Sequence, residues 1–296
     1  MKNSDFCVYA GKILSRHLQV LLKEAPAAGR GSDLEPLHRA RVSSRRLRAA
    51  LHAFHAGGLL PDRKTGQWIK QLSRIGRAFG PVRELDVQIR CLLRLKRKPE
   101  NSGYQAGISA LIRFCEKSRQ TAQKQIDSAL AGAVYDINSL NIFLTSDLLK
   151  TKAPTARQFA GGRKKIILKR LRQLLAHDVD LGQPSNIQKL HAARIAAKKL
   201  RYTLEIFQPF YGRRMNPFID AALGIQEILG DIHELDVWQQ FLSRNTGIPQ
   251  TRNFQAWRVH FQKSCAVERA RAYNKFFRIW TKRQRQHLWQ NIQKII

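Results

Sequence analysis

The chain has 296 residues, enough for one large helical domain or two of moderate size. Its hydrophobic content of 43% is that of a folded globular protein and excludes general disorder, despite a formal net charge of +32. Residues 1–152 and residues 153–296 carry +15 and +17, which excludes a basic tail on a neutral body. Because so large a charge repels itself, it predicts a polyanionic partner.

The sequence also indicates a cytoplasmic protein without a membrane anchor. The four cysteines lie far apart in the sequence and form no paired spacing, as expected for a reduced protein. The N-terminus lacks the apolar core of a signal peptide. No apolar run approaches the roughly 18–20 residues that a membrane span requires.

The first half of the chain is predicted to fold as a series of helices. An amphipathic helix over 5–23 carries Lys12 and Arg16 on its polar side. The segment from Pro26 to Gly31 is expected to end this helix.

A capping box follows, with Ser32 at the cap position and Glu35 three residues later. It opens a long helix that Gly57-Gly58 should end, and Gly80-Pro81 should interrupt the helical segment after that. The other helices predicted in this half run over about 63–79, 82–97 and 104–131.

The second half repeats this order of elements, so the chain is predicted to be all-α. Ser185 to Gln188 repeats the capping box before a helix that ends at Pro209 to Gly212. A break is expected at Gly230, with a new helix from near Glu234. Further helices are predicted over 252–276 and from about Phe277 to the end. The predicted organisation is a first helical repeat over 5–133, a junction over 134–156 and a second repeat over 157–296.

Two stretches, 37–54 and 190–207, align without a gap at an offset of 153 residues, with 8 of 18 positions identical. In each, apolar residues recur at steps of 3 and 4, as on the buried face of a helix. Basic residues recur at the same steps one position later, so they form a stripe beside the apolar face. The first stripe comprises His38, Arg41, Arg45 and Arg48, and the second stripe comprises His191, Arg194, Lys198 and Arg201.

A second motif repeats at an offset of 150 residues, because 80–87 and 230–237 share a glycine and the run Glu-Leu-Asp-Val. Carboxylates just after a glycine are well placed to cap a helix N-terminus and to hold nearby arginines. We therefore predict a structural role for these acids rather than metal binding or acid–base chemistry. The acids are Glu84, Asp86, Glu234 and Asp236.

With both motifs present twice, the chain resembles the CHAD (conserved histidine α-helical domain) family, from about Phe6 to the last helices. The resemblance implies two tandem four-helix-bundle-like subdomains, related by pseudo-twofold symmetry around a basic central cleft or pore. It also implies binding of inorganic polyphosphate and association with polyphosphate granules. The chain departs from the family at Glu84 and Glu234, where many members have Asp.

Polyphosphate is a flexible chain of anionic tetrahedral groups without bases, so its receptor needs many donors in a row and no stacking platform. Arg presents a planar fork that matches two phosphate oxygens, while Lys acts as a point charge. The predicted polyphosphate-binding residues are therefore those of the two stripes, helped by the first helix of each repeat. The helpers are Lys12, Arg16, Lys165 and Lys169, and Arg46 and Lys199, further round the helix, are secondary candidates.

His38 and His191 are predicted to be donors gained on binding, since neighbouring arginines depress the pKa of a histidine and a bound phosphate raises it. We expect no enzymatic activity, cofactor or metal, and the oligomeric state stays open. The charge alone equally allows a protein that binds RNA, DNA or another polyanion. The lack of a recognised nucleic-acid motif, and of aromatics interleaved with the stripes, favours polyphosphate.

Overall fold

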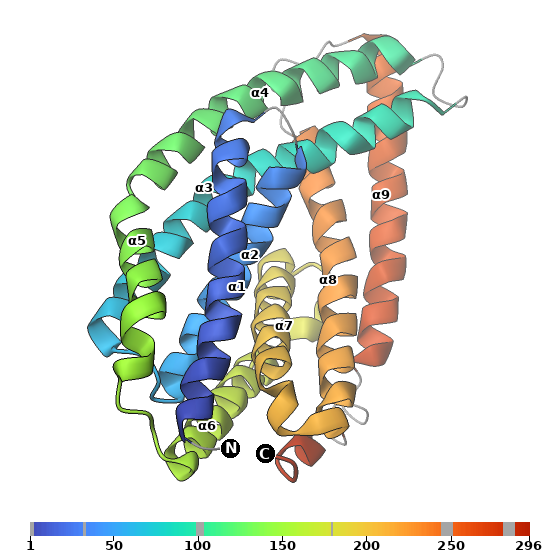
Figure 1. The fold of residues 1–296 in the computed structure, drawn as a ribbon. Coiled ribbons are helices and arrows are strands. Elements are labelled where there is room, and N and C mark those ends of the chain that lie inside the picture. The colour runs from blue at the N-terminus through green and yellow to red at the C-terminus, as the bar shows by residue number, and fades with distance from the viewer. Residues whose placement is uncertain (1–2, 32–33, 99–103, 179, 244–250, 281–287) are drawn as a thin grey trace. The chain divides into compact units, whose positions relative to one another are not determined.

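The computed structural model describes residues 3–31, 34–98, 104–178, 180–243, 251–280 and 288–296. Over these residues the fold is all-α, with short 3-10 and π turns between the helices and no strand. The helices are α1 (Asn3–Arg30), α2 (Leu34–Ala56), α3 (Asp62–Lys96), α4 (Gln105–Ala131), α5 (Val134–Ile142), α6 (Ala156–Leu175), α7 (Ile187–Phe207), α8 (Asn216–Ser243) and α9 (Arg252–Ile279) (Figure 1). None of these helices combines the length and the apolar character needed to cross a membrane.

The chain divides into two compact units, which we call the first unit and the second unit. The first unit consists of Met1–Gly162 and Gly247–Phe254, and the second unit consists of Arg163–Thr246 and Gln255–Ile296.

In the first unit, α1 packs along α2, α2 packs against α3, and α3 packs against α4 (Figure 1). The apolar stripe predicted for α2 is buried, and Leu47, Leu51 and Phe54 have no exposed surface. An aromatic pair joins α3 to the π turn Phe143–Asp147 that follows α5, since Trp68 packs against Phe143 with ring centroids 5.2 Å apart. The core of this unit therefore forms along the same face of α2 that the spacing of its apolar residues predicts.

In the second unit, α7 packs against α8. The helices α8 and α9 are joined by an edge-to-face contact between Trp238 and Phe261, with ring centroids 5.6 Å apart. Phe218 at the start of α8 packs against Trp289 from the C-terminal segment, with ring centroids 6.2 Å apart.

The sequence repeat is matched by local structure within each unit. Residues 81–90 and 231–240 share the same order of buried, half-buried and exposed positions, residue by residue. In the first unit, the side-chain amide of Gln123 donates to the carbonyl oxygen of Ala28 over 2.7 Å. In the second unit, the hydroxyl of Tyr273 donates to the carbonyl oxygen of Leu181 over 2.8 Å. Gln123 and Tyr273 are related by the offset of 150 residues, and Ala28 and Leu181 by the offset of 153. Different side chains thus make an equivalent hydrogen bond in the two units.

Two predicted helix breaks are wrong, since α3 continues through Gly80-Pro81 and α8 continues through Gly230. The helix α1 passes through Pro26 but does end within the predicted segment, at Arg30, before Gly31 with its positive φ of 71°. Both prolines are exposed, so water reaches the carbonyl that each proline leaves without its helical partner. The buried residues on either side of the proline in α3 keep its core face continuous, which overrides the local tendency to break.

The structure describes the predicted cap residue of the second capping box but not that of the first. In the second copy the cap is Asn186 rather than Ser185, because the Asn186 side chain accepts a hydrogen bond from the backbone N–H of Lys189 over 3.3 Å. Ser32, the predicted cap of the first copy, lies outside the described residues. The last helix is predicted to start at about Phe277, but Phe277 belongs to α9, which runs on to Ile279. Residues 288–292 are helical, and 281–287 lie outside the described part.

Candidate anion-binding site

A hollow of about 250 Å³ lies between α2 and α3 in the first unit. We call it the arginine hollow. Of the described residues, the seven that line it are four arginines, two serines and a glycine, without an acid or an aromatic ring. They are Arg41, Ser44, Arg45 and Arg48 from α2 and Ser73, Gly76 and Arg77 from α3. Three residues of the first stripe therefore meet in one concave site, at the point where α2 crosses α3.

Hydrogen bonds to α3 hold two of these arginines in place. Arg48 donates from Nη1 to the hydroxyl of Ser73 over 3.0 Å, and Arg41 donates from Nη1 to the carbonyl oxygen of Gly76 over 3.4 Å. The Ser73 hydroxyl in turn donates to the carbonyl oxygen of Ile69 over 2.7 Å, so it accepts from Arg48. Since a guanidinium has five N–H donors, the bond to Ser73 leaves most of the Arg48 fork for a ligand.

The arginines in this hollow repel one another. Burial lowers the pKa of Arg48, and the charges of Arg45 and Arg77 lower it further. Arginine nevertheless stays protonated in proteins, so the hollow keeps its positive charge. A bound polyanion would relieve this repulsion and would gain charge-assisted hydrogen bonds at the same time.

His38, the first residue of the first stripe, is half-buried on α2. Burial lowers the pKa of His38, and Arg83 lowers it further, while Glu35 acts in the opposite direction. The ring is therefore neutral at pH 7. The effect of nearby arginines agrees with the prediction, although burial is the larger cause. The Nη1 atom of Arg83 is buried without a hydrogen-bond partner, so a donor is left unsatisfied next to this histidine.

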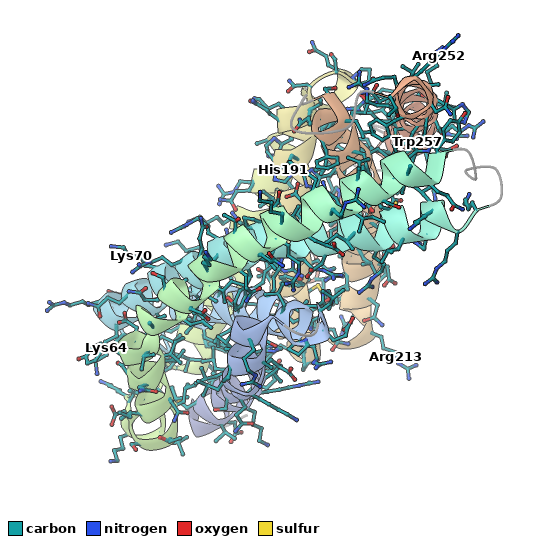
Figure 2. All side chains as sticks on the ribbon, turned by 90° about the horizontal axis from the view of Figure 1, so that it is seen from above. Lys64, Lys70, His191, Arg213, Arg252 and Trp257 are labelled. Carbon is teal, nitrogen blue, oxygen red and sulfur yellow. The ribbon has the colours of Figure 1, made fainter. Side chains whose placement is uncertain are left out.

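In the second unit, His191 of α7 (labelled in Figure 2) meets His233 of α8. Their Nδ1 atoms lie 3.1 Å apart and their ring centroids 4.3 Å apart. Burial lowers the pKa of His233 to about 4, and Arg194 is the next cause. The pKa of His191 is lowered by burial first, then by Arg194 and Lys198. The second stripe therefore places two cations beside a neutral histidine pair.

The remaining predicted residues are spread more widely. Arg201 forms an ion pair with Glu205 over 3.4 Å and lies over the ring of Tyr202, so part of its charge is already compensated. Arg46 acts on His17 of α1. Burial lowers the pKa of His17 to about 4, and the charge of Arg46 is the next largest cause of this shift. The other candidates are exposed on helix surfaces. They are Lys12 and Arg16 on α1, Lys165 and Lys169 on α6, and Lys199 on α7.

The acids of the repeated motif lie inside helices, so the prediction that they cap helix N-termini is wrong. Asp86 is buried and accepts from Nε of Arg119 over 2.6 Å, and Asp236 is paired in the same way with Arg269. Each pair joins the motif to the helix that follows it, and the two arginines are themselves 150 residues apart. Glu84 and Glu234 are exposed.

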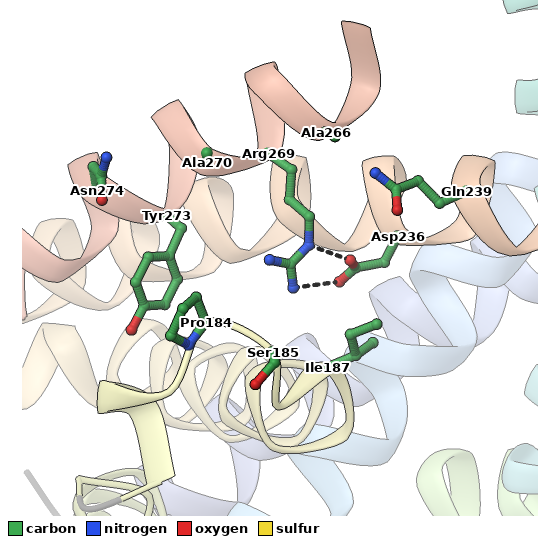
Figure 3. A pocket seen from close by; sticks show the side chains of 10 residues that line it. All are labelled: Pro184, Ser185, Ile187, Asp236, Gln239, Ala266, Arg269, Ala270, Tyr273 and Asn274. Carbon is green, nitrogen blue, oxygen red and sulfur yellow. Dashed lines mark hydrogen bonds and ion pairs between the residues drawn. The ribbon is translucent and has the colours of Figure 1, made fainter. Parts of the chain in front are cut away.

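A second hollow, of about 490 Å³, lies in the second unit beside the Asp236–Arg269 pair (Figure 3). Apart from that pair, the described residues that line it are neutral, from Pro184 before α7 and Ile187 at its start to Tyr273 on α9. Because Arg269, the cation among these described lining residues, is already paired with a carboxylate, this hollow offers little attraction to a polyanion. Among the described residues, no three His, Cys, Asp or Glu side chains come together as a metal site requires.

Three basic side chains near the stripes were not predicted from the sequence, namely Arg77, Arg83 and His233. Each lies on the helix that packs against its stripe, α3 in the first unit and α8 in the second, so the spacing of residues within the stripe does not predict its position. A signal was nevertheless present. Each of the three differs in residue type from its counterpart in the other copy, which marks positions where the two copies have diverged in chemistry.

The fold and the site together define an all-α protein with an internal repeat and a cationic helix face in each unit. The chain belongs to the CHAD domain family, whose model matches residues 12–243.

Several solved structures share the fold, and two of them show its extent. The CHAD domain from the plant Ricinus communis matches with a TM-score of 0.67 and 23% sequence identity, over 93% of this chain and 91% of that one. PptA from Streptomyces chartreusis matches with a TM-score of 0.59 and 16% identity, over 93% of this chain and 99% of that one. At these identities the likeness concerns the fold alone. No curated protein matches the chain.

Proposed function

We propose that the protein binds inorganic polyphosphate without chemical turnover, through the basic stripes of α2 and α7. The pseudo-twofold arrangement and the basic central cleft implied by the family resemblance are part of this proposal, as is a cytoplasmic location. The observation that carries it is the arginine hollow, in which four guanidinium groups converge without an acid among the described lining residues.

The donor chemistry of the hollow supports a phosphate chain as the ligand. Linked phosphates present acceptor oxygens on every side, and each guanidinium can donate to two of them at once. The stripe continues beyond the hollow to His38, so a chain that enters the hollow has further donors along the same helix face. An extended anion therefore fits this surface better than a single small one does.

Nucleic acid is the second candidate, because the overall charge would attract it equally. Single-stranded nucleic acids are usually held by aromatic side chains on which the bases stack. None of the described residues that line the arginine hollow is aromatic. This composition favours a polyanion without bases.

A binding role also agrees with the state of the buried acids. Asp86 and Asp236 are each engaged by an arginine, so neither is placed to act as a general base or to hold a metal ion. His38 and His191 have pKa values lowered mainly by burial and become better donors once an anion is bound.

A competition experiment separates the two candidates. Labelled long-chain polyphosphate is bound to the full chain and challenged with unlabelled polyphosphate, RNA or DNA at equal phosphate concentration. We expect unlabelled polyphosphate to displace the label at concentrations at least tenfold below those needed for RNA or DNA. Equal displacement by either nucleic acid would contradict the proposal and support the second candidate.

A further inference from the structure

The two units differ at the positions that form the arginine hollow. The offset of 150 residues places Leu223, Gln226 and Glu227 of α8 where α3 has Ser73, Gly76 and Arg77. Across the hollow, Ser44 of α2 corresponds to Ala197 of α7. The second unit thus has an acid in place of one arginine, a larger side chain in place of the glycine, and apolar side chains in place of both serine hydroxyls.

Gly76 leaves the arginine hollow open. A Cβ atom added at Gly76 would have no heavy atom within 4 Å apart from the neighbouring backbone of its own helix. The backbone there is ordinary α-helix without a positive φ, so the glycine is not required by the turn of the chain. At the matching position of the second unit, the Gln226 side chain is half-buried and its Oε1 atom lies away from solvent. A side chain at this position therefore occupies space that Gly76 leaves free.

Neither serine can donate to a ligand, and Ser73 holds one of the arginines in place. The hydroxyl hydrogen of Ser44 is donated to the carbonyl oxygen of Leu72 over 3.2 Å, and that of Ser73 is donated to Ile69. Neither hydroxyl has a hydrogen left for a phosphate oxygen. Ser73 accepts from Arg48 instead and fixes its guanidinium at the wall of the hollow.

Building on the proposed function, we propose that the arginine hollow is a subsite of its own that anchors two or three linked phosphates, and that the residues of the second unit do not reproduce it. The arginines that α2 contributes to the hollow extend over two helical turns, from Arg41 to Arg48, or about 10 Å along the helix, which suits a short run of linked phosphates. Arg77 is the specificity-determining residue, because its counterpart Glu227 reverses the charge. Gly76 is the residue that provides access.

The test is calorimetric titration of the full chain with tripolyphosphate. We expect one tight site per chain. The substitution Gly76→Gln, which copies the second unit without changing the charge, should weaken binding at least tenfold. Arg77→Glu should weaken it as much or more.

The control is Gly66→Gln on the same helix, at an exposed glycine that also has nothing within 4 Å of an added Cβ. It should leave the affinity within twofold of the unmodified chain. Glutamine is a better helix former than glycine, so both glutamine variants should keep their helicity, as circular dichroism will verify. Unchanged tripolyphosphate affinity in Gly76→Gln would overturn the subsite.

The reciprocal change tests the other half of the inference. The double variant Gln226→Gly and Glu227→Arg gives the second unit the residues of the first at these two positions. It should add a second tripolyphosphate site per chain, and a stoichiometry that stays at one would contradict the role assigned to these positions.

A parallel titration with long-chain polyphosphate distinguishes failure of the subsite from failure of the proposed function. Binding of the long chain without tight binding of tripolyphosphate would remove the subsite and leave the proposed function standing. Failure of the long chain to bind would remove both.

Discussion

The Nδ1 atoms of His191 and His233 lie 3.1 Å apart across the contact between α7 and α8. One of these nitrogens must carry a hydrogen and the other must accept it, so the contact requires at least one neutral ring. Protonation of both rings would place two N–H groups face to face beside Arg194 and Lys198. The histidine pair is therefore a point where the fold of the second unit depends on pH.

Acidification should destabilise the protein in a defined window. Burial lowers the pKa of His233 to about 4, below the ordinary value of 6.5, so the unfolded chain binds more protons between these two values. The free energy of unfolding should fall as pH falls from about 6.5 to about 4, the range over which the contribution of His233 is lost. We expect a loss of about 1–2 kcal/mol from this residue, since its partial exposure screens the effect. Urea unfolding at closely spaced pH values measures it.

The substitution His233→Gln should reduce the loss of stability in this window, because glutamine has no proton to gain, while the share from His17, whose pKa burial also lowers to about 4, remains. His260→Gln, at an exposed position on α9, serves as the control and should leave the profile unchanged. If His233→Gln and the unmodified chain lose stability in parallel over this window, the histidine pair is not the cause.

Polyphosphate binding should also respond to pH, in the opposite sense. The pKa values of His38 and His191 are lowered in the free protein, and a bound phosphate favours the protonated ring. Binding should therefore take up protons, and the affinity for long-chain polyphosphate should rise several-fold between pH 8 and pH 6 at constant ionic strength. The double variant His38→Gln and His191→Gln should lose most of this dependence, whereas a variant that keeps it would exclude these rings as donors.

The buried ion pair of Asp86 and Arg119 should be essential for stability. The side chain of Asp86 is fully buried and that of Arg119 is 13% exposed. Replacing Asp86 with Ala leaves a buried guanidinium without its partner, which should cost about 3–5 kcal/mol of unfolding free energy. Asp236→Ala should have a similar effect through Arg269. Urea unfolding at pH 7 measures both.

The matched control for these substitutions is Glu268→Ala, which removes an ion pair with Arg271. The side chains of Arg271 and Glu268 are 71% and 54% exposed. Exposed pairs contribute little, so this change should cost less than about 0.5 kcal/mol. A loss in Asp86→Ala no larger than in Glu268→Ala would show that the buried pair does not hold α3 to α4.

Much of the fold could be predicted because the apolar spacing on α2 and α7 is regular and repeated. Buried leucines at steps of 3 and 4 identify the core face without knowledge of the partner helix. The helices nevertheless run on through Pro26, Gly80-Pro81 and Gly230. Both prolines are exposed, and a glycine inside a helix costs only about 1 kcal/mol, less than the loss of core contacts on the opposite face.

The site could be predicted only in part, for a related reason. Arg41, Arg45 and Arg48 share one helix, so their spacing alone places them together. Arg77 and Ser73 join them only because α3 crosses α2 at that turn, and helix packing is not encoded in either helix alone. Comparison of the two copies would have marked Arg77, since the aligned position holds Glu227.

The salt dependence of binding should reveal how many basic groups take part. If about eight Lys and Arg side chains each neutralise a phosphate, the logarithm of the affinity should fall with the logarithm of the salt concentration with a slope of about −5 to −7. Fluorescence anisotropy with labelled long-chain polyphosphate at several salt concentrations measures the slope. A slope near −1 would indicate a small, specific anion instead.

The most direct measurement is the affinity of a charge-reversal variant for long-chain polyphosphate. In that variant, Arg41, Arg45, Arg194 and Lys198 are all replaced by Glu. The control variant carries the same change of charge at four exposed lysines of α4 and α9, namely Lys117, Lys124, Lys263 and Lys275. We expect the stripe variant to lose binding by at least a hundredfold with its helicity intact, and the control to stay within about tenfold of the unmodified chain, a loss that long-range repulsion explains. Equal losses in both variants, or preserved affinity in the stripe variant, would contradict a binding site on these two helices.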